Sequence, residues 1–90
     1  MPYYTLVERD EYGLWWPQFG DYDKQTVIDE MVDNFNPHVC KLLVTPKDDQ
    51  KDIDRGVKLI NAAMPVGFFW SLEKLEEFAK AFSLLEEYYS

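Results

Sequence analysis

The stretch from Leu14 to Thr26 reads Leu-Trp-Trp-Pro-Gln-Phe-Gly-Asp-Tyr-Asp-Lys-Gln-Thr, and it decides the predicted fold. Aromatic residues dominate its first half, as they do in β-strands, so we expect a strand over Leu14–Phe19. Gly20-Asp21-Tyr22-Asp23 breaks that strand, and Asp23 has the short carboxylate side chain that caps a helix N-terminus. The stretch therefore predicts a strand, a sharp turn and the start of a helix.

The residues before this stretch predict its partner strand. Tyr3–Arg9 is rich in aromatic and β-branched residues, and Gly13 supplies the positive φ that a tight turn needs. The two strands therefore form a hairpin. Since side chains alternate across a strand, Leu6 and Val7 point to opposite faces. Pro17 has no N–H for a ladder, so we expect its strand to lie at an edge or to be bulged there.

The rest of the chain predicts three helices, one strand and a linker. Val27 and Met31 belong to an apolar stripe of helical spacing, and Asn36-Pro37 ends that helix. Gly56 costs a helix about 1 kcal/mol relative to alanine, which suggests either close packing at this position or a helix that its neighbours hold in place. In order, these elements are a helix over Lys24–Phe35, a strand over His38–Thr45, a helix from about Pro46 to Ala63, an apolar linker over Met64–Trp70, and a helix from Leu72 to about Tyr88 that Ser71 caps.

The order of elements is therefore strand, strand, helix, strand, helix, helix (ββαβαα). A chain of 90 residues with a hydrophobic share of 47% fits one small domain. We expect an α+β fold, in which a three-stranded, mainly antiparallel sheet carries the helices on one face.

The net charge of the chain indicates the chemistry of its partner. Seventeen Asp and Glu residues against nine Lys and Arg residues give a net charge of −8. Direct binding to nucleic acid is not expected, because contact with phosphates needs clustered basic residues. The charge favours a partner protein with a basic surface, or else it serves only to keep the chain soluble, with no specific partner. Membrane insertion is not expected either, since no apolar run approaches the roughly 18 residues that a spanning helix needs.

The start of the chain and its cysteine content predict a cytoplasmic protein. Its first residues lack the basic and then apolar pattern of a secretory signal. Cys40 is the single cysteine, so an internal disulfide is excluded. If the chain is encoded by a phage, the expected location is the cytoplasm of the host cell.

Neither a metal site nor a catalytic centre is expected. His38 and Cys40 are the only histidine and cysteine, whereas a structural zinc site needs four such ligands. The pair would share one face of the predicted strand, but no third group or oxyanion loop completes a catalytic dyad. The acidic stretch Asp48–Asp54 lacks the glycine and distal glutamate of an EF-hand. We therefore expect no catalytic residue, no metal, no cofactor and no enzymatic activity.

Two interpretations of the acidic clusters remain open. Carboxylates at a helix N-terminus offset the helix macrodipole, which gives Asp21, Asp23 and Asp48–Asp54 a structural role. The alternative is mimicry of DNA, in which carboxylates spaced like phosphates occupy a basic groove. A mimic would combine Asp48–Asp54 with Asp29, Glu30 and Asp33, although lysines interrupt the series.

The adjacent tryptophans Trp15 and Trp16 must point to opposite faces of their strand. One of them can enter the core. The other is either covered by Phe68–Trp70 and the last helix or exposed as an anchor for a partner, a role that tryptophan and tyrosine often play.

Part of the chain resembles a family of small proteins of tailed phages and bacterial prophages that itself has no established activity. The resemblance covers residues 1–62, and residues 63–90 add the C-terminal helix outside it. Lys24 departs from the family pattern, which usually has arginine there. The residues that carry the resemblance are Tyr4-Thr5-Leu6, Arg9-Asp10, Trp16, Phe19-Gly20-Asp21-Tyr22-Asp23 and Val27, and more weakly Lys41-Leu42-Leu43, Thr45, Ile53-Asp54, Val57 and Asn61-Ala62.

The resemblance implies a phage or prophage origin and a compact α+β fold. Small acidic phage proteins that block host defence, such as anti-CRISPR proteins, form an analogous class in size and charge. We therefore expect a non-enzymatic protein that binds and inhibits a host protein through an acidic, aromatic surface. The expected contacts are Trp15, Trp16, Asp21, Tyr22 and Asp23, with Asp29, Glu30 and Asp33 as a charged rim.

A second interpretation is a structural or assembly protein that self-associates. Its last helix would pair with that of a second copy, as in a homodimer, through Phe78, Phe82 and Leu85.

Overall fold

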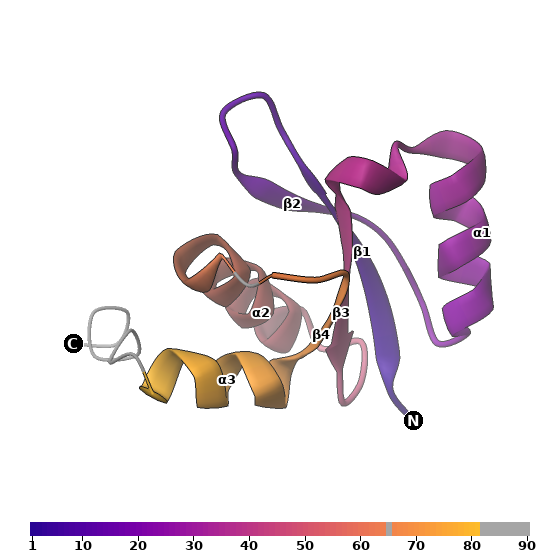
Figure 1. Cartoon of the computed structure of the whole chain (residues 1–90). Helices are drawn as coiled ribbons and strands as arrows, with labels where there is room; N and C mark the ends of the chain where they lie inside the picture. Colours follow the sequence, from indigo (N-terminus) through magenta and orange to yellow (C-terminus); the bar gives the residue numbers. More distant parts are fainter. Residues whose placement is uncertain (65, 82–90) are drawn as a thin grey trace.

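A computed structural model of the chain describes residues 1–64 and 66–81 (Figure 1). The elements of this part are β1 (Tyr3–Arg9), β2 (Trp15–Asp21), α1 (Lys24–Asn34), a 3-10 turn (Pro37–Val39), β3 (Cys40–Thr45), α2 (Gln50–Ala63), β4 (Phe69–Ser71) and α3 (Leu72–Ala81). The predicted end of the last helix, near Tyr88, lies outside the described residues.

The described sheet has four strands in the order β2-β1-β3-β4, so the expectation of three strands was wrong. β1 is antiparallel to β2 and β3, whereas β4 runs parallel to β3. The fourth strand comprises the last two residues of the predicted apolar linker, Phe69 and Trp70, and the predicted cap Ser71. It pairs Phe69 with Leu42 and Ser71 with Val44. Helix α2 carries the chain back along the sheet, which is why this last pair is parallel.

Helices cover both faces of the sheet, and the expectation of one covered face was wrong as well. α1 packs on one face, and α2 and α3 pack on the other (Figure 1). The cause is visible in β1, where Leu6 and Val7 are both fully buried and face opposite sides, as the sequence predicted. The core on the α1 face includes Leu6, Val27, Met31, Cys40 and Leu42; the core on the other face includes Val7, Trp15, Leu43, Ile53, Val57, Leu59, Ile60, Leu72 and Leu75.

A β-bulge in β2 sends two aromatic side chains to opposite faces. Leu6 pairs with Phe19 and Val7 pairs with Pro17, which leaves Gln18 as an extra residue. In a regular strand without a bulge, the four-residue spacing would place Trp15 and Phe19 on the same face. In the fold, Trp15 joins the core under α2 and Phe19 packs in the core under α1. β2 is also an edge strand of the described sheet, as its proline predicted.

The close packing expected at Gly56 is confirmed. A Cβ atom added to this glycine would lie 2.6 Å from Cδ2 and 2.7 Å from Cδ1 of Leu43. Leu43 lies in the middle of β3 and is fully buried. A side chain at position 56 would require Leu43 to shift, so the glycine permits α2 to pack closely against β3.

The region between α1 and β3 differs from its prediction. Residues 37–39 form a 3-10 turn, because Pro37 favours a helical start and the Asn36 side chain accepts a hydrogen bond from the His38 N–H at 3.1 Å. The third strand therefore begins at Cys40 instead of His38. His38 is exposed and Cys40 is buried, so they do not form the same-face pair that a longer strand would create.

Helix α2 also begins later than predicted. Its first residue is Gln50, because the Asp49 carboxylate accepts a hydrogen bond from the Lys51 N–H at 2.9 Å and caps the helix there. The predicted caps of the other helices are confirmed: Asp23 caps α1 and Ser71 accepts a hydrogen bond from the Lys74 N–H.

Candidate functional site

The N-termini of α1, α2 and α3 lie at the same end of the molecule. β2 and β3 are both antiparallel to β1, and β4 is parallel to β3, so β2, β3 and β4 run in the same direction. Each of them is followed by a helix. The carboxyl ends of these three strands therefore lie at the same end of the sheet. We call this end of the molecule the acidic end. It comprises seven carboxylates and one tyrosine: Asp21, Tyr22, Asp23, Asp48, Asp49, Asp52, Glu73 and Glu76.

The turn from β2 to α1 is built by two of these carboxylates. Asp21 accepts a hydrogen bond from the Asp23 N–H at 2.7 Å. Asp23 in turn accepts from the Gln25 N–H at 3.2 Å and from the Thr26 hydroxyl at 2.8 Å. Both aspartates thus shape the turn and stabilise the first turn of α1, and Asp23 remains exposed to a partner.

Tyr22 links this turn to the second acidic segment. Its hydroxyl oxygen accepts a hydrogen bond from the Asp48 N–H at 3.3 Å, and its ring lies edge-on to Tyr3 with 4.9 Å between centroids. A hydrogen bond to the Asp48 carboxylate raises the pKa of Tyr22. Burial, together with the negative charges of Asp48 and Asp21, raises the pKa of Tyr3. Two acidic segments that are distant in the sequence therefore form one electronegative surface.

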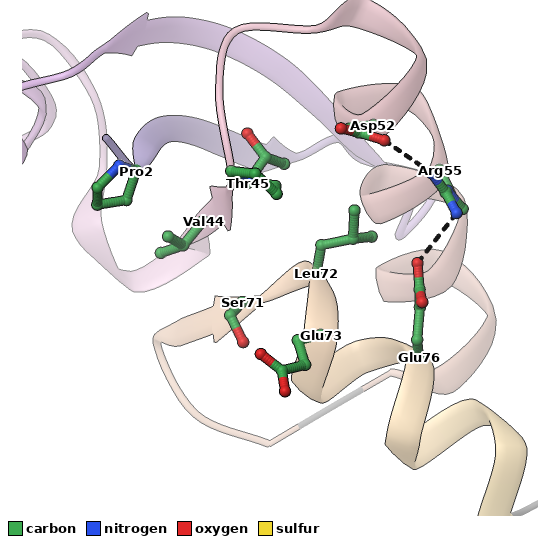
Figure 2. A pocket seen from close by; sticks show the side chains of 10 residues that line it. Pro2, Val44, Thr45, Asp52, Arg55, Ser71, Leu72, Glu73 and Glu76 are labelled. Carbon is green, nitrogen blue, oxygen red and sulfur yellow. Dashed lines mark hydrogen bonds and ion pairs between the residues drawn. The ribbon is translucent and has the colours of Figure 1, made fainter.

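A pocket of about 430 Å³ lies at the same end, between the ends of β3 and β4 and the first turns of α2 and α3 (Figure 2). Arg55 lies at its wall and forms ion pairs with Asp52 at 2.7 Å and with Glu76 at 3.2 Å. Glu73 also lines the pocket. With three carboxylates and one guanidinium in its lining, the pocket suits a cationic group better than an anionic one.

The two tryptophans lie away from the acidic end. Trp15 is buried, with an exposed fraction of 9%, whereas Trp16 is 51% exposed. The Trp16 indole N–H donates to the Asp10 carboxylate at 2.7 Å. Because both residues begin the strand that Asp21 ends, roughly 20 Å of extended chain separates them from the acidic turn. The structure therefore does not bring the predicted aromatic and acidic contacts together at one point.

The acidic residues of α1 lie on the opposite side of the sheet from α2. Asp29 accepts a hydrogen bond from the Gln25 side chain and Glu30 accepts one from the Asn34 side chain, each at 2.9 Å, and Asp33 is exposed. Since the sheet separates α1 from α2, these residues do not form one continuous stripe with Asp48–Asp54. The uninterrupted charge that a mimic of duplex DNA needs is absent between the two helices.

Sequence reasoning missed Lys41 as a residue of interest. Its exposed fraction is only 9%, although lysines are seldom buried without a charged partner. Its ammonium donates to the Gly67 carbonyl and lies 5.3 Å from the centroid of the Trp15 ring. Burial, and then the positive charge of Arg9, lower the pKa of Lys41. The available signal was its position beside the central apolar run of the predicted strand His38–Thr45, a run that is typical of a buried strand.

Replacing Lys41 with methionine is expected to raise the free energy of unfolding at neutral pH by about 1 kcal/mol, because a buried charge is exchanged for an apolar chain of similar length. The folded pKa of Lys41 lies below its ordinary value of 10.5. The unfolded chain therefore binds more protons, and the wild-type protein gains stability as the pH rises through this window.

The advantage of Lys41→Met should consequently shrink towards alkaline pH. Urea unfolding at several pH values measures it, with exposed Lys51→Met as the control. A constant advantage at all pH values would contradict the role assigned to burial of the charge.

No protein-family model, curated protein or solved structure matches this chain. Within residues 1–64 and 66–81, none of the helices has the length and apolar character needed to cross a membrane. In the same part of the chain, no three His, Cys, Asp or Glu side chains are grouped so that they could hold a metal ion. The Cys40 thiol is buried, and its burial raises the pKa to about 11, so little of the reactive thiolate forms at neutral pH.

Proposed function

We propose that this chain is a non-enzymatic protein of phage or prophage type that binds a basic surface of a host protein and inhibits it, as anti-CRISPR proteins do. The observation that carries the proposal is the convergence of two acidic segments at Tyr22, whose hydroxyl bonds to Asp48. The phage origin and the inhibitory role rest on the resemblance described above and on the small size and net charge of −8.

The acidic end supports binding through charge. Capping α1 and α2 accounts for Asp23 and Asp49, and Arg55 partly neutralises Asp52 and Glu76. Asp21, Asp48 and Glu73 add three further negative charges at the same end, with Asp21 in the turn before α1 and Glu73 in the first turn of α3. A concentration of one sign of charge speeds association with a surface of the opposite sign and excludes partners of like charge.

The pocket at Arg55 supports a partner with a lysine or arginine at the centre of its surface. A cationic side chain entering from solvent would lie between Glu73 and Glu76 and weaken the hold of Arg55 on Glu76. Arg55 and Glu76 are both partly exposed, with exposed side-chain fractions of 41% and 38%, so this exchange costs little.

The proposed contacts are Asp21, Tyr22 and Asp23, with Asp29, Glu30 and Asp33 as a more distant charged rim. Of the two tryptophans, Trp16 is the one whose ring is available to a partner, because the Trp15 ring belongs to the core.

The test neutralises the acidic turn without unfolding it. Asn caps a helix as well as Asp does, so the double variant Asp21→Asn with Asp23→Asn removes two charges and keeps the turn. Tagged wild-type protein is expected to capture one dominant basic host protein from a bacterial lysate at low salt and to release it at high salt. The double variant should capture at least tenfold less.

A control variant, Glu8→Gln with Glu11→Gln, makes the same change in charge outside both acidic segments and should bind as the wild type does. Equal capture by both variants would show that the acidic turn is not the binding surface. Inhibition is tested by expressing each variant in a host with an active CRISPR system. The wild type should restore plaque formation by a targeted phage, and the acidic-turn variant should not.

Self-association is the second candidate, and the exposed apolar side chains near β4 favour it. Val66 is 92% exposed, and Phe68 and Phe69 are 38% and 44% exposed. β4 is the outermost strand of the described sheet on that side. Measurement of mass at high protein concentration separates the two functions: a dimer that Phe69→Ser abolishes supports assembly, and a monomer at all concentrations rejects it.

A further inference from the structure

A second, smaller pocket of about 250 Å³ lies at the opposite end of the sheet from the acidic end. Its lining comes from the end of β1 (Arg9), the hairpin (Gly13 and Trp15), the start of β3 (Lys41) and the residue that ends α2 (Met64). β1 and β3 are antiparallel, which is why the end of one and the start of the other meet here.

Two cationic side chains, Arg9 and Lys41, form cation–π contacts with the Trp15 ring in this pocket. The Arg9 guanidinium carbon lies 5.9 Å and the Lys41 ammonium 5.3 Å from the centre of the ring. Lys41 pairs with Val7 across the ladder, and Arg9 lies two residues further along the same face of β1. Long side chains at such diagonal positions reach one another. Arg9 and Lys41 therefore repel each other at the wall of a partly apolar pocket.

Among the described residues, no carboxylate forms an ion pair with Arg9 or Lys41. Arg55 and Lys74, by contrast, each pair with at least one carboxylate. Glu8 and Asp10 flank Arg9 in the sequence. Glu8 lies on the opposite face of β1, where it pairs with Cys40, and Asp10 accepts hydrogen bonds from the Tyr12 and Leu14 N–H groups and from the Trp16 indole. Carboxylates outnumber basic groups in this chain, whose net charge is −8, so two neighbouring cations without a carboxylate partner need an explanation.

We propose that this pocket binds a small carboxylic acid, with its carboxylate held by Arg9 and Lys41 and its apolar body against Trp15 and Met64. The ammonium of Lys41 has three N–H donors, of which the Gly67 carbonyl takes one. The guanidinium of Arg9 offers a planar pair of donors that matches a carboxylate. An anion between them replaces repulsion with two attractions.

The size and the walls of the pocket define the ligand class. A volume of about 250 Å³ is below the roughly 300–1,000 Å³ typical of drug-sized ligands, so it suits an acid of about ten heavy atoms or fewer. The indole ring and the methionine chain favour a flat or aliphatic body over a fully hydrated ion such as inorganic phosphate.

Benzoate is the probe, and the indole N–H signals of the protein in NMR spectra are the readout. The signal of Trp15 is expected to move and to saturate with a dissociation constant of about a millimolar, while Trp16 and Trp70 serve as internal references. Bound benzoate should also raise the pKa of Lys41, observed at its ε-carbon, because an adjacent negative charge favours the ammonium.

Two matched probes and two variants decide the result. Uncharged benzamide and inorganic phosphate are expected to cause less than a tenth of the benzoate effect, and Lys41→Met and Arg9→Gln should each weaken benzoate binding at least tenfold. Lys51→Met should leave binding unchanged. The proposal is overturned if the Trp15 signal never saturates, if benzamide or phosphate acts as benzoate does, or if both pocket variants still bind.

Discussion

Replacement of Trp15 by alanine is expected to lower the free energy of unfolding by about 3–5 kcal/mol, whereas the same change at the adjacent Trp16 should cost about 1 kcal/mol. The Trp15 ring is buried in the core under α2, and its removal leaves a cavity between the sheet and the helix. Trp16 is half exposed and loses mainly the hydrogen bond from its indole to Asp10.

The two variants form a matched pair, because they remove the same side chain from neighbouring positions of one strand. Urea denaturation with a far-ultraviolet circular dichroism readout measures both. The main-chain bonds between Trp15 and the Asn61 side chain, at 2.7 and 3.2 Å, remain possible in the variant, so the difference reports the indole ring itself. Similar losses for both variants would mean that Trp16 also supports the core and is not available to a partner.

Gly56→Ala is expected to destabilise the protein by about 2 kcal/mol, although alanine is the better helix former by about 1 kcal/mol. The new methyl group would overlap the end of the Leu43 side chain, which is fully buried and would have to shift within a packed core. Thermal and urea unfolding of the single variant test the sign of the effect.

A double-mutant cycle with Leu43→Ala identifies the cause. The Leu43 variant is itself destabilised, by about 2–5 kcal/mol, but it removes the atoms that the new methyl group at position 56 would meet. In that background Gly56→Ala should be neutral or stabilising, which gives a coupling free energy of about 2 kcal/mol. Additive effects would show that the glycine is needed for a reason other than contact with Leu43.

The parts of the fold that depend on neighbouring residues in the sequence could be predicted. The alternation at Leu6 and Val7, the cap at Asp23 and the close packing at Gly56 each follow from local chemistry, and each is confirmed. The strand Phe69–Ser71 could not be predicted, because three residues are too few to show alternation and their pairing with β3 forms only after α2 has turned the chain back.

The candidate site, too, could be predicted from the sequence only in part. The acidic character of Asp21, Asp23 and Asp48 is evident in the sequence, but their meeting at Tyr22 depends on β2 and β3 running in the same direction. The side of the sheet that each helix covers is equally non-local, so one covered face was expected instead of two. Lys41 was overlooked because the charge of a side chain is a poor guide to burial when an aromatic ring lies beside it.

The bulge at Gln18 has a consequence for insertions and deletions in this chain. The Gln18 side chain is exposed, so many residue types can occupy the position. The bulge absorbs this extra residue, which is why Trp15 and Phe19 face opposite cores although four positions separate them. A protein shortened by one residue at this point would leave them three positions apart in a regular strand, and their side chains would still face opposite sides of the sheet. Position 18 is therefore almost free in chain length as well as in chemistry, whereas a deletion between Trp15 and Pro17 would turn Trp15 out of its core unless the bulge were lost.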